Sequence, residues 1–392
     1  MPDRPEWPPH SLPAAMSDVD VAIVGAGPAG CAAATTIAAF SHHRVTVIER
    51  SAPVQKPGEM LQPGADALLE YLGIGPSALA TIHKPSHSLA SAWGSDQRVE
   101  RPLIGSMGPP AMHVDRIGFE AMLRRRAASC GASFHHGHLA RAERQRDHWR
   151  LSVRSDEQPI QINARFIIDA SGRGARLACQ AGASIHTTHR TVAAWRTGSL
   201  RSDRDAQLNG SVLVEAVPEG WWYSAAQPGN VIAAALFTDA DEMRQARLNR
   251  APGWREALAR TTHTKTRLAD LESWGPLQIR PAHVQFIAPA HGRDWIACGD
   301  AAIAVDPLSS MGISLALLTG IHAGRIAAAA CSGQDVGDCG YSREIRRQHL
   351  THIDTLKRFF EAETRWPDAP FWKRRHSKPN ASVEDAPRDV LV

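Results

Sequence analysis

Several features that define large protein classes are missing from this 392-residue sequence. Its six cysteines are scattered and form no Cys-x-x-Cys pair, which argues against a disulfide scaffold and against a structural zinc site. The 44 basic and 40 acidic residues leave a net charge of +4, which is too weak and too mixed for a nucleic-acid-binding surface. We therefore expect a reduced, cytoplasmic protein that holds no metal and binds no nucleic acid.

A convincing membrane span and a signal peptide are also missing. The stretch from Val19 to Phe40 is nearly all apolar, but three glycines and a proline interrupt it, and a strand, a turn and a helix explain it better. The first fifteen residues are rich in proline and polar side chains, unlike a signal peptide. We expect no stable membrane insertion and a disordered leader over residues 1–17, with Met1 or Met16 as the true start.

The outer parts of the chain alternate between predicted strands and helices, which is typical of an α/β fold with a parallel sheet. The strands are expected at residues 19–24, 44–48, 149–153, 165–168 and 295–298. The helices are expected at residues 28–40, 65–72, 116–130 and 312–330, with a charged helix at 343–363 near the end.

The middle of the chain has a different pattern. Strand-like segments separated by short polar breaks lie at residues 191–195, 211–217, 221–226 and 231–237. Such a run without intervening helices is typical of an antiparallel sheet. Neighbouring residues of a strand point to opposite faces, so one of Trp221 and Trp222 is expected to pack in the core and the other to line a cavity.

A glycine-rich turn joins the first predicted strand to the first helix and fits the GxGxxG pattern. The first glycine allows a tight turn, the second lets the backbone approach a pyrophosphate, and the third lets helix and strand touch. The amino end of the helix adds unpaired N–H groups that favour phosphate. The residues of this turn that we assign to a dinucleotide are Gly25, Gly27, Pro28, Ala29 and Gly30.

Glu49 ends the second predicted strand, at the spacing from the glycine turn where an acid binds ribose hydroxyls. A carboxylate at this place disfavours a 2′-phosphate. The dinucleotide is therefore expected to be FAD or NAD rather than NADP.

Two further motifs decide between these dinucleotides. Cys298 to Ala302 follows a buried strand, and Asp306 to Gly312 opens the long apolar helix. Both resemble the GD motif of FAD-dependent monooxygenases, in which the aspartate binds the ribityl chain and the helix amino end faces the flavin pyrimidine. Asp169 to Gly174 is similar to the middle DG-type motif of that family, with alanine in place of the usual glycine.

With these motifs in the family's order over residues 18–330, the sequence resembles the FAD-dependent monooxygenase and tryptophan halogenase-like superfamily, which has the aromatic-hydroxylase fold. The resemblance implies a Rossmann-like FAD-binding domain of the GR2 type, an inserted antiparallel substrate-binding sheet and a C-terminal helix. Beyond the glycine turn, it assigns FAD contacts to Glu49, Arg50, Arg116, Asp169, Gly172, Gly299, Asp300, Ser310, Gly312 and Ile313.

The resemblance also divides the chain into a discontinuous FAD-binding domain, a substrate-binding domain and a C-terminal part. The FAD-binding domain is expected at residues 18–75, 112–185 and 286–335. The substrate-binding sheet is expected at residues 76–111 and 186–285, and a C-terminal helix with a basic tail at 336–392. We interpret Lys373 to His376 as a solvated tail, with docking of an acidic partner as the alternative, and His135 to His138 as a polar strand and turn rather than a metal site.

Finer features point to one branch of the superfamily. Lys56 to Pro63 is similar to the Pro-Gly-Glu loop of halogenases, but the W-x-W-x-I-P motif of halogenases is absent. The segments Ser91–Ser95, Asp306–Ser310 and Arg365–Pro367 are similar to flavoproteins that mature tryptophylquinone amino-acid oxidases, such as lysine ε-oxidase and glycine oxidase. Those enzymes hydroxylate a tryptophan of a partner polypeptide.

The resemblance therefore implies a monooxygenase that hydroxylates an aromatic, indole-like group through a flavin C4a-hydroperoxide formed with O₂. Its electrons would come from NAD(P)H or from a separate flavin reductase. Its substrate is expected to be a tryptophan in the precursor of a partner quinoprotein oxidase, or a small aromatic compound. The candidate catalytic residues are Glu59, Asp306 and Pro307, and the candidate pocket residues are Trp93, Trp195 and Trp222, drawn from an unusual excess of 11 Trp over 9 Phe.

Three alternatives remain open at this point. The first is a flavin-dependent halogenase, whose product would depend on bromide or chloride. The second is an FAD reductase of the geranylgeranyl-reductase type, which would consume no oxygen. The third is an FAD-binding maturation protein whose turnover is not required.

Overall fold

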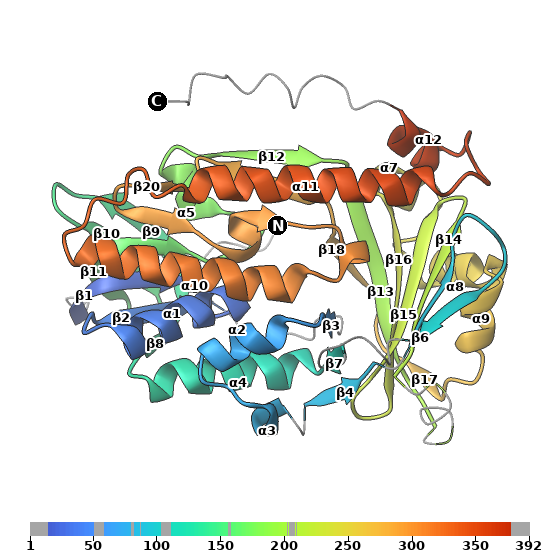
Figure 1. The fold of residues 1–392 in the computed structure, drawn as a ribbon, viewed down its shortest axis with the longest axis horizontal. Coiled ribbons are helices and arrows are strands. Elements are labelled where there is room, and N and C mark those ends of the chain that lie inside the picture. The colour runs from blue at the N-terminus through green and yellow to red at the C-terminus, as the bar shows by residue number, and fades with distance from the viewer. Residues whose placement is uncertain are drawn as a thin grey trace.

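The computed structural model describes residues 15–50, 59–79, 82–86, 88–102, 111–155, 158–201, 203, 208 and 210–377. These residues form two parts, which long helices join (Figure 1). A part built on a mostly parallel sheet stands on the left of that view, and a part built on a mostly antiparallel sheet stands on the right. The α/β architecture with an antiparallel sheet is therefore confirmed.

The parallel sheet carries the glycine turn. Its strand order is β20-β21-β11-β1-β2-β8, and all neighbours except β20 and β21 run parallel. The antiparallel pair β9 and β10 extends it beside β11. The strands are β1 (Ala15–Val24), β2 (Val45–Glu49), β8 (Ser133–His136), β9 (His138–Arg144), β10 (Trp149–Arg154), β11 (Ile160–Asp169), β20 (His291–Gly292) and β21 (Trp295–Ala297).

Three helices pack beside one another along this sheet: α1 (Pro28–Phe40), α4 (Arg116–Ser129) and α10 (Gly312–Cys331). Helices α1 and α10 approach closely because glycine faces the contact, and a Cβ atom on Gly320 would lie 2.2 Å from the carbonyl oxygen of Ala29. By length and composition alone α10 could cross a membrane. Here half of its most apolar stretch is buried inside the protein, where it acts as a core helix.

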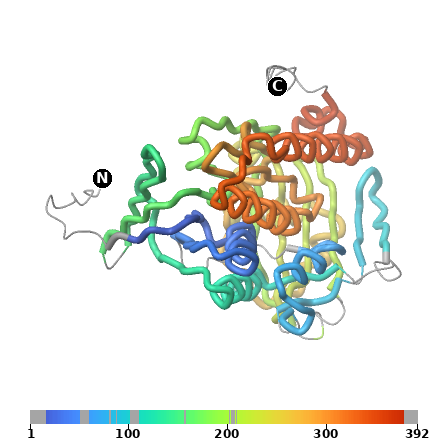
Figure 2. The backbone as a smooth tube through the Cα atoms, turned by 60° about the vertical axis from the view of Figure 1, so that its left-hand side comes forward, coloured from blue at the N-terminus to red at the C-terminus, as the bar shows by residue number. Residues whose placement is uncertain are grey.

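The antiparallel sheet has the strand order β17-β13-β16-β15-β14-β5-β6, and β18 also pairs with β13. The run of strands expected at 191–237 is confirmed as β13 to β16, each paired with a neighbour. Figure 2 shows the β5–β6 hairpin at the outer edge of this part. The strands are β5 (Ser88–Ala92), β6 (Val99–Pro102), β13 (Thr191–Ser199), β14 (Val212–Val217), β15 (Gly220–Gln227), β16 (Val231–Asp239), β17 (Ser273–Trp274) and β18 (Gln278–Pro281).

Alternation along these strands gives the antiparallel sheet two apolar faces. One face, here called the helix face, packs on α7 (Ala240–Gln245), α8 (Ala251–Arg260) and α9 (His263–Arg267). The other, here called the inner face, packs on Met60 and on the C-terminal segment. Both faces are therefore covered, and the two sides of each strand have separate environments.

Two three-stranded sheets lie beside the large ones. The first has the order β3-β7-β4 and the second β12-β19-β22. Their strands are β3 (Glu59–Leu61), β4 (His83–Pro85), β7 (Met112–Val114), β12 (Ser184–Thr188), β19 (Val284–Ala288) and β22 (Ile303–Ala304). The short helices are α2 (Ala65–Tyr71), α3 (Pro76–Leu79) and α5 (Arg176–Gln180).

Two predicted boundaries differ from the elements observed. Strand β1 begins at Ala15, inside the expected leader, because residues 15–17 continue the parallel pairing with β11. Residues 1–14 lie outside the described part of the chain. Strand β12 crosses the expected boundary after residue 185, since it pairs with β19 along its whole length.

The C-terminal segment closes the fold. Helix α11 (Tyr341–Glu361) runs along both parts and leads to α12 (Pro370–His376) (Figure 1). The expectation of a solvated tail at Lys373 to His376 is wrong for the conformation and for Arg375: these residues end α12, and Lys373 and Arg374 are exposed, but the Arg375 side chain is only 1% exposed. Its guanidinium lies 2.8 Å from the Asp239 carboxylate at the end of β16 and 3.4 Å from the centre of the Phe371 ring.

This ion pair explains why the segment folds back. Burial alone would raise the pKa of Asp239, but hydrogen bonds and charge from Arg375 and Arg374 outweigh burial and lower that pKa. Arg374 reaches the same carboxylate at 2.8 Å, yet it is 41% exposed. Arg375 is therefore the partner that solvent cannot replace.

We expect Arg375→Met to lower the free energy of unfolding by about 3 kcal/mol, since it leaves a buried carboxylate with a weaker partner. Chemical denaturation measures this loss. The exposed neighbour provides the control, because Arg374→Met should cost under about 1 kcal/mol. Equal losses of stability in the two variants would show that burial of the Arg375–Asp239 pair does not increase its contribution to the free energy of unfolding.

Candidate functional site

Loops from four parallel strands meet at the carboxyl edge of the first sheet. The N–H of Gly25, after β1, donates to the Ile48 carbonyl at 2.9 Å, and the N–H of Ala170, after β11, donates to the Val24 carbonyl at 2.9 Å. The N–H of Cys298, after β21, donates to the Asp169 carbonyl at 2.9 Å. The structure therefore brings the three sequence motifs together at one edge, where ligands of such sheets bind.

The three motif glycines have different surroundings. Gly25 has φ +109°, and a Cβ atom there would lie 2.3 Å from the Ala170 carbonyl oxygen. A Cβ atom on Gly30 would lie 1.9 Å from the Gly25 carbonyl oxygen, so both positions require glycine for close backbone contact. A Cβ atom on Gly27 would meet nothing within 4 Å. The turn is thus open at the position where a pyrophosphate would approach.

The first turn of α1 suits an anion. Gly27 is its N-cap and supplies no side-chain cap, while Pro28 opens the helix without an N–H and Ala29 and Gly30 follow. Glu49 stands beside the turn, where its Oε2 accepts a hydrogen bond from the Ala26 N–H at 2.6 Å. This arrangement fits the adenosine and pyrophosphate of FAD. Arg50 follows Glu49 at the surface.

The middle motif has a structural carboxylate, which corrects one prediction. Asp169 is fully buried, and its oxygens accept hydrogen bonds from the Ser171 N–H at 3.0 Å, the Ser171 hydroxyl at 2.6 Å and the Ala178 N–H at 3.0 Å. Asp169 therefore shapes the turn rather than contacting a cofactor. Gly172 follows with φ +82°, a conformation that favours glycine.

Asp300 is placed differently from Asp169. Its side chain is 43% exposed and lies 3.5 Å from the Arg173 guanidinium. Gly299 before it has φ +59°, and a Cβ atom there would lie 2.7 Å from the Ala29 side chain. Asp300 is thus held beside α1 with its carboxylate accessible, as a ribityl contact requires. Arg173 was missed from the sequence, although it belongs to the middle motif.

The loop from Asp306 to Gly312, here called the flavin-side loop, leads into α10. Asp306 is buried and its Oδ1 accepts a hydrogen bond from the Leu308 N–H at 2.9 Å. Burial raises the pKa of Asp306 to about 6, although that hydrogen bond lowers it. Pro307 begins a short 3₁₀ turn, and Ser310 has φ +51°.

The amino end of α10 has no side-chain cap, because its N-cap is Met311. Its first N–H groups, at Gly312 and Ile313, have no acceptor within the helix, and a helix amino end of this kind favours negative charge. The residues therefore fit a reduced flavin, whose pyrimidine edge is anionic.

Arg116 begins α4, where its Nη2 lies 2.7 Å from the Glu120 carboxylate. Arg116 was predicted to contact the flavin, and this ion pair gives it a competing structural role. Arg124, one turn beyond Glu120, donates to the Ala26 carbonyl at 3.3 Å and so links α4 to the glycine turn. Sequence patterns gave no signal for Arg124, because its partner is a backbone carbonyl far along the chain.

The predicted catalytic Glu59 is described only by its backbone, which pairs with Val114 between β3 and β7. Its side chain and residues 56–58 of the Pro-Gly-Glu loop lie outside the described part of the structure. The next residue, Met60, packs on the inner face. Strand β3 therefore lies against the inner face of the antiparallel sheet.

The predicted pocket tryptophans lie in three different places. Trp195 packs on the inner face, as does Trp221, which stacks on Phe237 with ring centres 4.0 Å apart. Trp222 is fully buried on the helix face, 5.0 Å from the ring of Trp254, so its assignment to the pocket is wrong. The strand alternation was predicted correctly, but the tryptophan that faces inward is Trp221.

Trp93 lies at the edge of the inner face. Its indole N–H donates to the Phe359 carbonyl at 2.7 Å, and its ring meets Trp372 edge to face at 5.4 Å. Trp93 thus joins the sheet to the C-terminal segment. We interpret it as a wall of the inner face rather than as a substrate contact.

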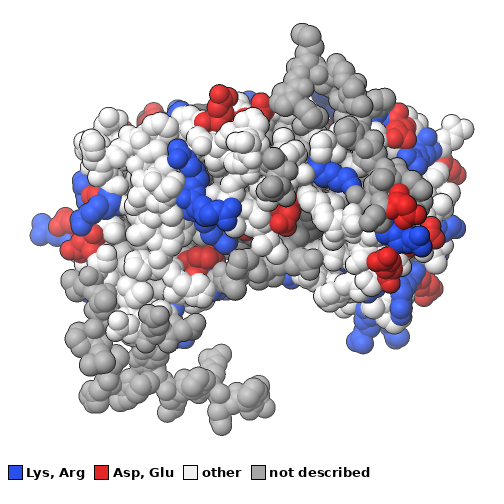
Figure 3. Space-filling view, turned by 90° about the horizontal axis from the view of Figure 1, so that it is seen from below, with Lys and Arg blue, Asp and Glu red and all other residues white. Residues whose placement is uncertain are grey.

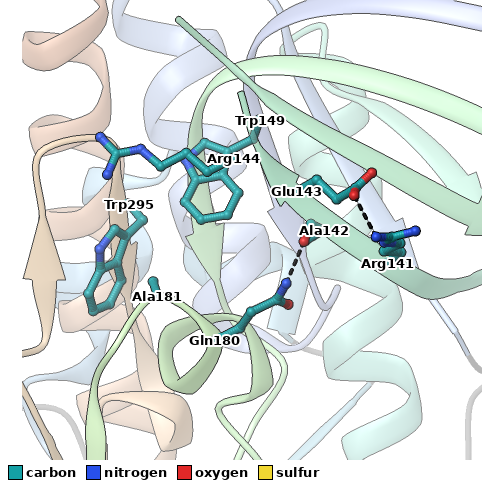
Figure 4. A pocket seen from close by; sticks show the side chains of 8 residues that line it. All are labelled: Arg141, Ala142, Glu143, Arg144, Trp149, Gln180, Ala181 and Trp295. Atoms are coloured by element: carbon teal, nitrogen blue, oxygen red, sulfur yellow. Dashed lines mark hydrogen bonds and ion pairs between the residues drawn. The ribbon is translucent and has the colours of Figure 1, made fainter. Parts of the chain in front are cut away.

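A separate pocket of about 450 Å³ lies over the β9–β10 hairpin (Figure 4). The indole rings of Trp149 and Trp295 and the Arg144 side chain stand around it, and Gln180 reaches it from α5. The described residues that line it include none of the predicted cofactor residues. Its position gives it no role in the site at the carboxyl edge.

Comparison with known proteins agrees with this geometry. A family model for an FAD binding domain matches residues 18–347. The FAD-dependent oxidoreductase LodB of Marinomonas mediterranea is 28% identical over 367 residues, which cover 92% of this chain and 98% of LodB.

Two solved structures share the fold. The flavin-dependent halogenase CmlS has a TM-score of 0.82 at 24% identity, covering 94% of this chain and 69% of that one. The peptidyl tryptophan dihydroxylase QhpG, described as essential for tryptophylquinone cofactor biogenesis, has a TM-score of 0.69 at 22% identity, covering 93% of this chain and 80% of that one.

We expect Asp300→Ala to reduce the FAD-to-protein ratio of the purified protein at least about tenfold, because a lost hydrogen bond to a charged group costs about 1.5–3 kcal/mol. The absorbance of bound flavin measures this ratio. Asp338→Ala, which removes an exposed carboxylate paired with Arg343, should leave it unchanged. An Asp300→Ala protein that stays fully yellow would refute the motif assignment.

We expect Asp306→Asn to change how stability depends on pH. The folded-state pKa of Asp306, about 6, lies above the ordinary 3.8, so its stabilising effect is full below pH 3.8 and is lost as pH rises through 6. Between pH 5 and pH 8 the parent protein should therefore lose about 1 kcal/mol more than Asp306→Asn. Denaturant titrations at both pH values test this, and parallel losses would contradict the shift.

Proposed function

We propose that this chain is a monooxygenase that acts on aromatic, indole-like groups. The proposal starts from the finding that the chain belongs to the FAD binding domain family and is an FAD-dependent oxidoreductase. Its substrate in this proposal is a tryptophan of a partner polypeptide, the precursor of a quinoprotein oxidase. When bound, reduced FAD supplies the activation of O₂ for transfer of one oxygen atom. The protein supplies binding, orientation and a dry site.

The residues that would hold FAD are those at the carboxyl edge. The open glycine turn and the first turn of α1 would hold the pyrophosphate, and Glu49 would hold the ribose. Asp300 would bind the ribityl chain, and the uncapped amino end of α10 would stabilise the pyrimidine edge. These roles use backbone N–H groups and two carboxylates.

The observation that carries the proposal is the contact between the flavin-side loop and the inner face. Leu308 from that loop and Met60 from β3 pack in the same apolar cluster as Trp195 and Trp221. A buried aromatic cluster therefore meets the loop that leads to the flavin edge. In this proposal the cluster forms the apolar wall behind the substrate ring and excludes the water that would destroy a reactive oxygen species.

Asp306 is the ionisable group best placed to move a proton there. It begins the flavin-side loop and is buried, and the rise of its pKa to about 6 brings it near the range in which a carboxyl both accepts and releases protons. Pro307 fixes the backbone after it, so the carboxyl keeps its orientation.

Similarity to QhpG supports the choice of a polypeptide substrate, because QhpG is described as a peptidyl tryptophan dihydroxylase. Similarity to LodB over most of both chains supports the oxidoreductase activity. The CmlS likeness supports halogenation as the second candidate, because CmlS has the higher TM-score. The reaction, rather than the fold, must separate the two.

We also propose a cytoplasmic location, which is supported by six cysteines that the structure leaves without any disulfide. The electrons come in this proposal from NAD(P)H bound for a short time or from a separate reductase. On the face in Figure 3, basic and acidic side chains lie in small groups of both signs, which offers no single-sign surface for a charged partner.

The proposal predicts that the reduced holoenzyme incorporates oxygen from ¹⁸O₂ into tryptophan of an unmodified tryptophylquinone-oxidase precursor. The probes are that precursor, free tryptophan and indole, with bromide present or absent, and mass spectrometry reads the product. A bromide-dependent product would favour a halogenase. Turnover without oxygen would favour a reductase and contradict the proposal.

Two buried tryptophans provide matched variants for this assay. Trp195→Phe weakens the aromatic cluster that packs on Met60 and Leu308, and it is expected to raise KM for the aromatic substrate several-fold, since aromatic packing of this kind contributes about 1 kcal/mol. Trp222→Phe makes the same change on the helix face and should leave KM unchanged. Equal effects would mean that the inner face does not contact substrate.

A further inference from the structure

We propose that His352, on the C-terminal helix α11, is a positioning residue for the flavin-side loop. It acts through the backbone of Asp306 and touches no reacting atom. The hydrogen bond between His352 and Asp306 is present in the fold whatever the protein does. The inference rests on the proposed function only where it assigns that bond a part in catalysis. It assigns to α11 a role that no sequence motif indicates.

The flavin-side loop is built around Asp306 by its own hydrogen bonds. The Asp306 side chain accepts from the Leu308 N–H at 2.9 Å, and its carbonyl accepts from the Ser309 hydroxyl at 2.8 Å and the Ser309 N–H at 3.1 Å. The Ser310 N–H donates to the Pro307 carbonyl at 3.0 Å. These bonds make the loop one compact unit, but they do not fix where that unit lies.

The remaining backbone group of Asp306 provides the external attachment. Its N–H donates to Nε2 of His352 at 2.9 Å, in a buried position. An imidazole nitrogen accepts a hydrogen bond only when it carries no proton, so His352 must be neutral with its proton on Nδ1. Burial agrees with this state, because it lowers the pKa of His352 to about 4.

Packing of α11 against a neighbouring small sheet holds the His352 imidazole in place. One turn earlier, His349 packs on the Phe286 ring at 4.4 Å, and His186, the cross-strand partner of Phe286, stacks on the same ring at 4.8 Å. Phe286 lies in β19, which pairs with β22, and β22 directly precedes the flavin-side loop. The rotation of α11 is therefore fixed against the same small sheet from which the loop starts.

The same helix reaches the substrate side. Leu356 and Phe360, one and two turns beyond His352, pack on the inner face with Trp221. Figure 1 shows α11 running along both parts of the molecule. A single rigid helix thus sets the distance between the flavin-side loop and the inner face, and His352 is its contact with the loop.

The test compares three variants by amide hydrogen exchange of the flavin-side loop in FAD-free protein and by FAD affinity from fluorescence quenching. His352→Leu removes the acceptor and should raise exchange at Asp306 and in the loop at least tenfold and weaken FAD binding about tenfold. His352→Gln keeps an acceptor and should stay within threefold of the parent. His349→Leu, one turn away, keeps an apolar side chain against Phe286 and leaves the acceptor on His352, so both readouts should stay within twofold of the parent.

If His352→Leu does not fold, His352→Phe takes its place, because it keeps a ring but offers no acceptor. The inference is overturned if the variant without an acceptor behaves like His349→Leu in both readouts. Neither readout requires oxygenation. A failed hydroxylation assay would therefore refute the proposed function and leave this result standing.

Discussion

The close backbone contact of α1 with its neighbours is the constraint on which the cofactor site depends. A side chain at Gly30 would collide with the Gly25 carbonyl, and one at Gly320 would collide with the Ala29 carbonyl. Because Gly30 and Gly320 have no side chains, the first turn of α1 reaches the sheet edge and α10 packs alongside α1. The two helix amino ends, one for the pyrophosphate and one for the flavin edge, are positioned by the same contact.

Burial has a second, electrostatic effect around the flavin-side loop. It raises the pKa of Asp306 and lowers the pKa of His352, so both groups are pushed toward their neutral forms. Asp306 is neutral only below a pH of about 6, and above that pH its carboxylate adds a negative charge beside the amino end of α10. His352 stays neutral above a pH of about 4, so the hydrogen bond that it accepts from the Asp306 N–H adds no charge to the loop.

Local patterns predicted the parts of the fold that local physics determines. The glycine turn, helix α1 and the strands β13 to β16 follow from spacing and alternation over a few residues. The inward-facing tryptophan could not be predicted, because alternation places Trp221 and Trp222 on opposite faces without saying which face the helices cover. Arg375 was misjudged for a similar reason, since its partner Asp239 is 136 residues away in the chain.

The division between the two sheets also explains how one fold serves different reactions. The FAD contacts use backbone groups and few side chains, so they constrain only a few positions. On the inner face, only every second residue of each strand is available, and cross-strand pairs set its shape. Trp221 and Phe237 lie opposite each other, with Ala193 beyond, while Ala235 separates Tyr223 from Trp195. Exchanging an alanine for a larger residue in these rows would change the shape of the surface without touching the FAD-binding edge. In the proposed function, substrate choice is therefore concentrated in a small number of inner-face positions, and exchanging these residues is the sharpest way to separate a hydroxylase from a halogenase.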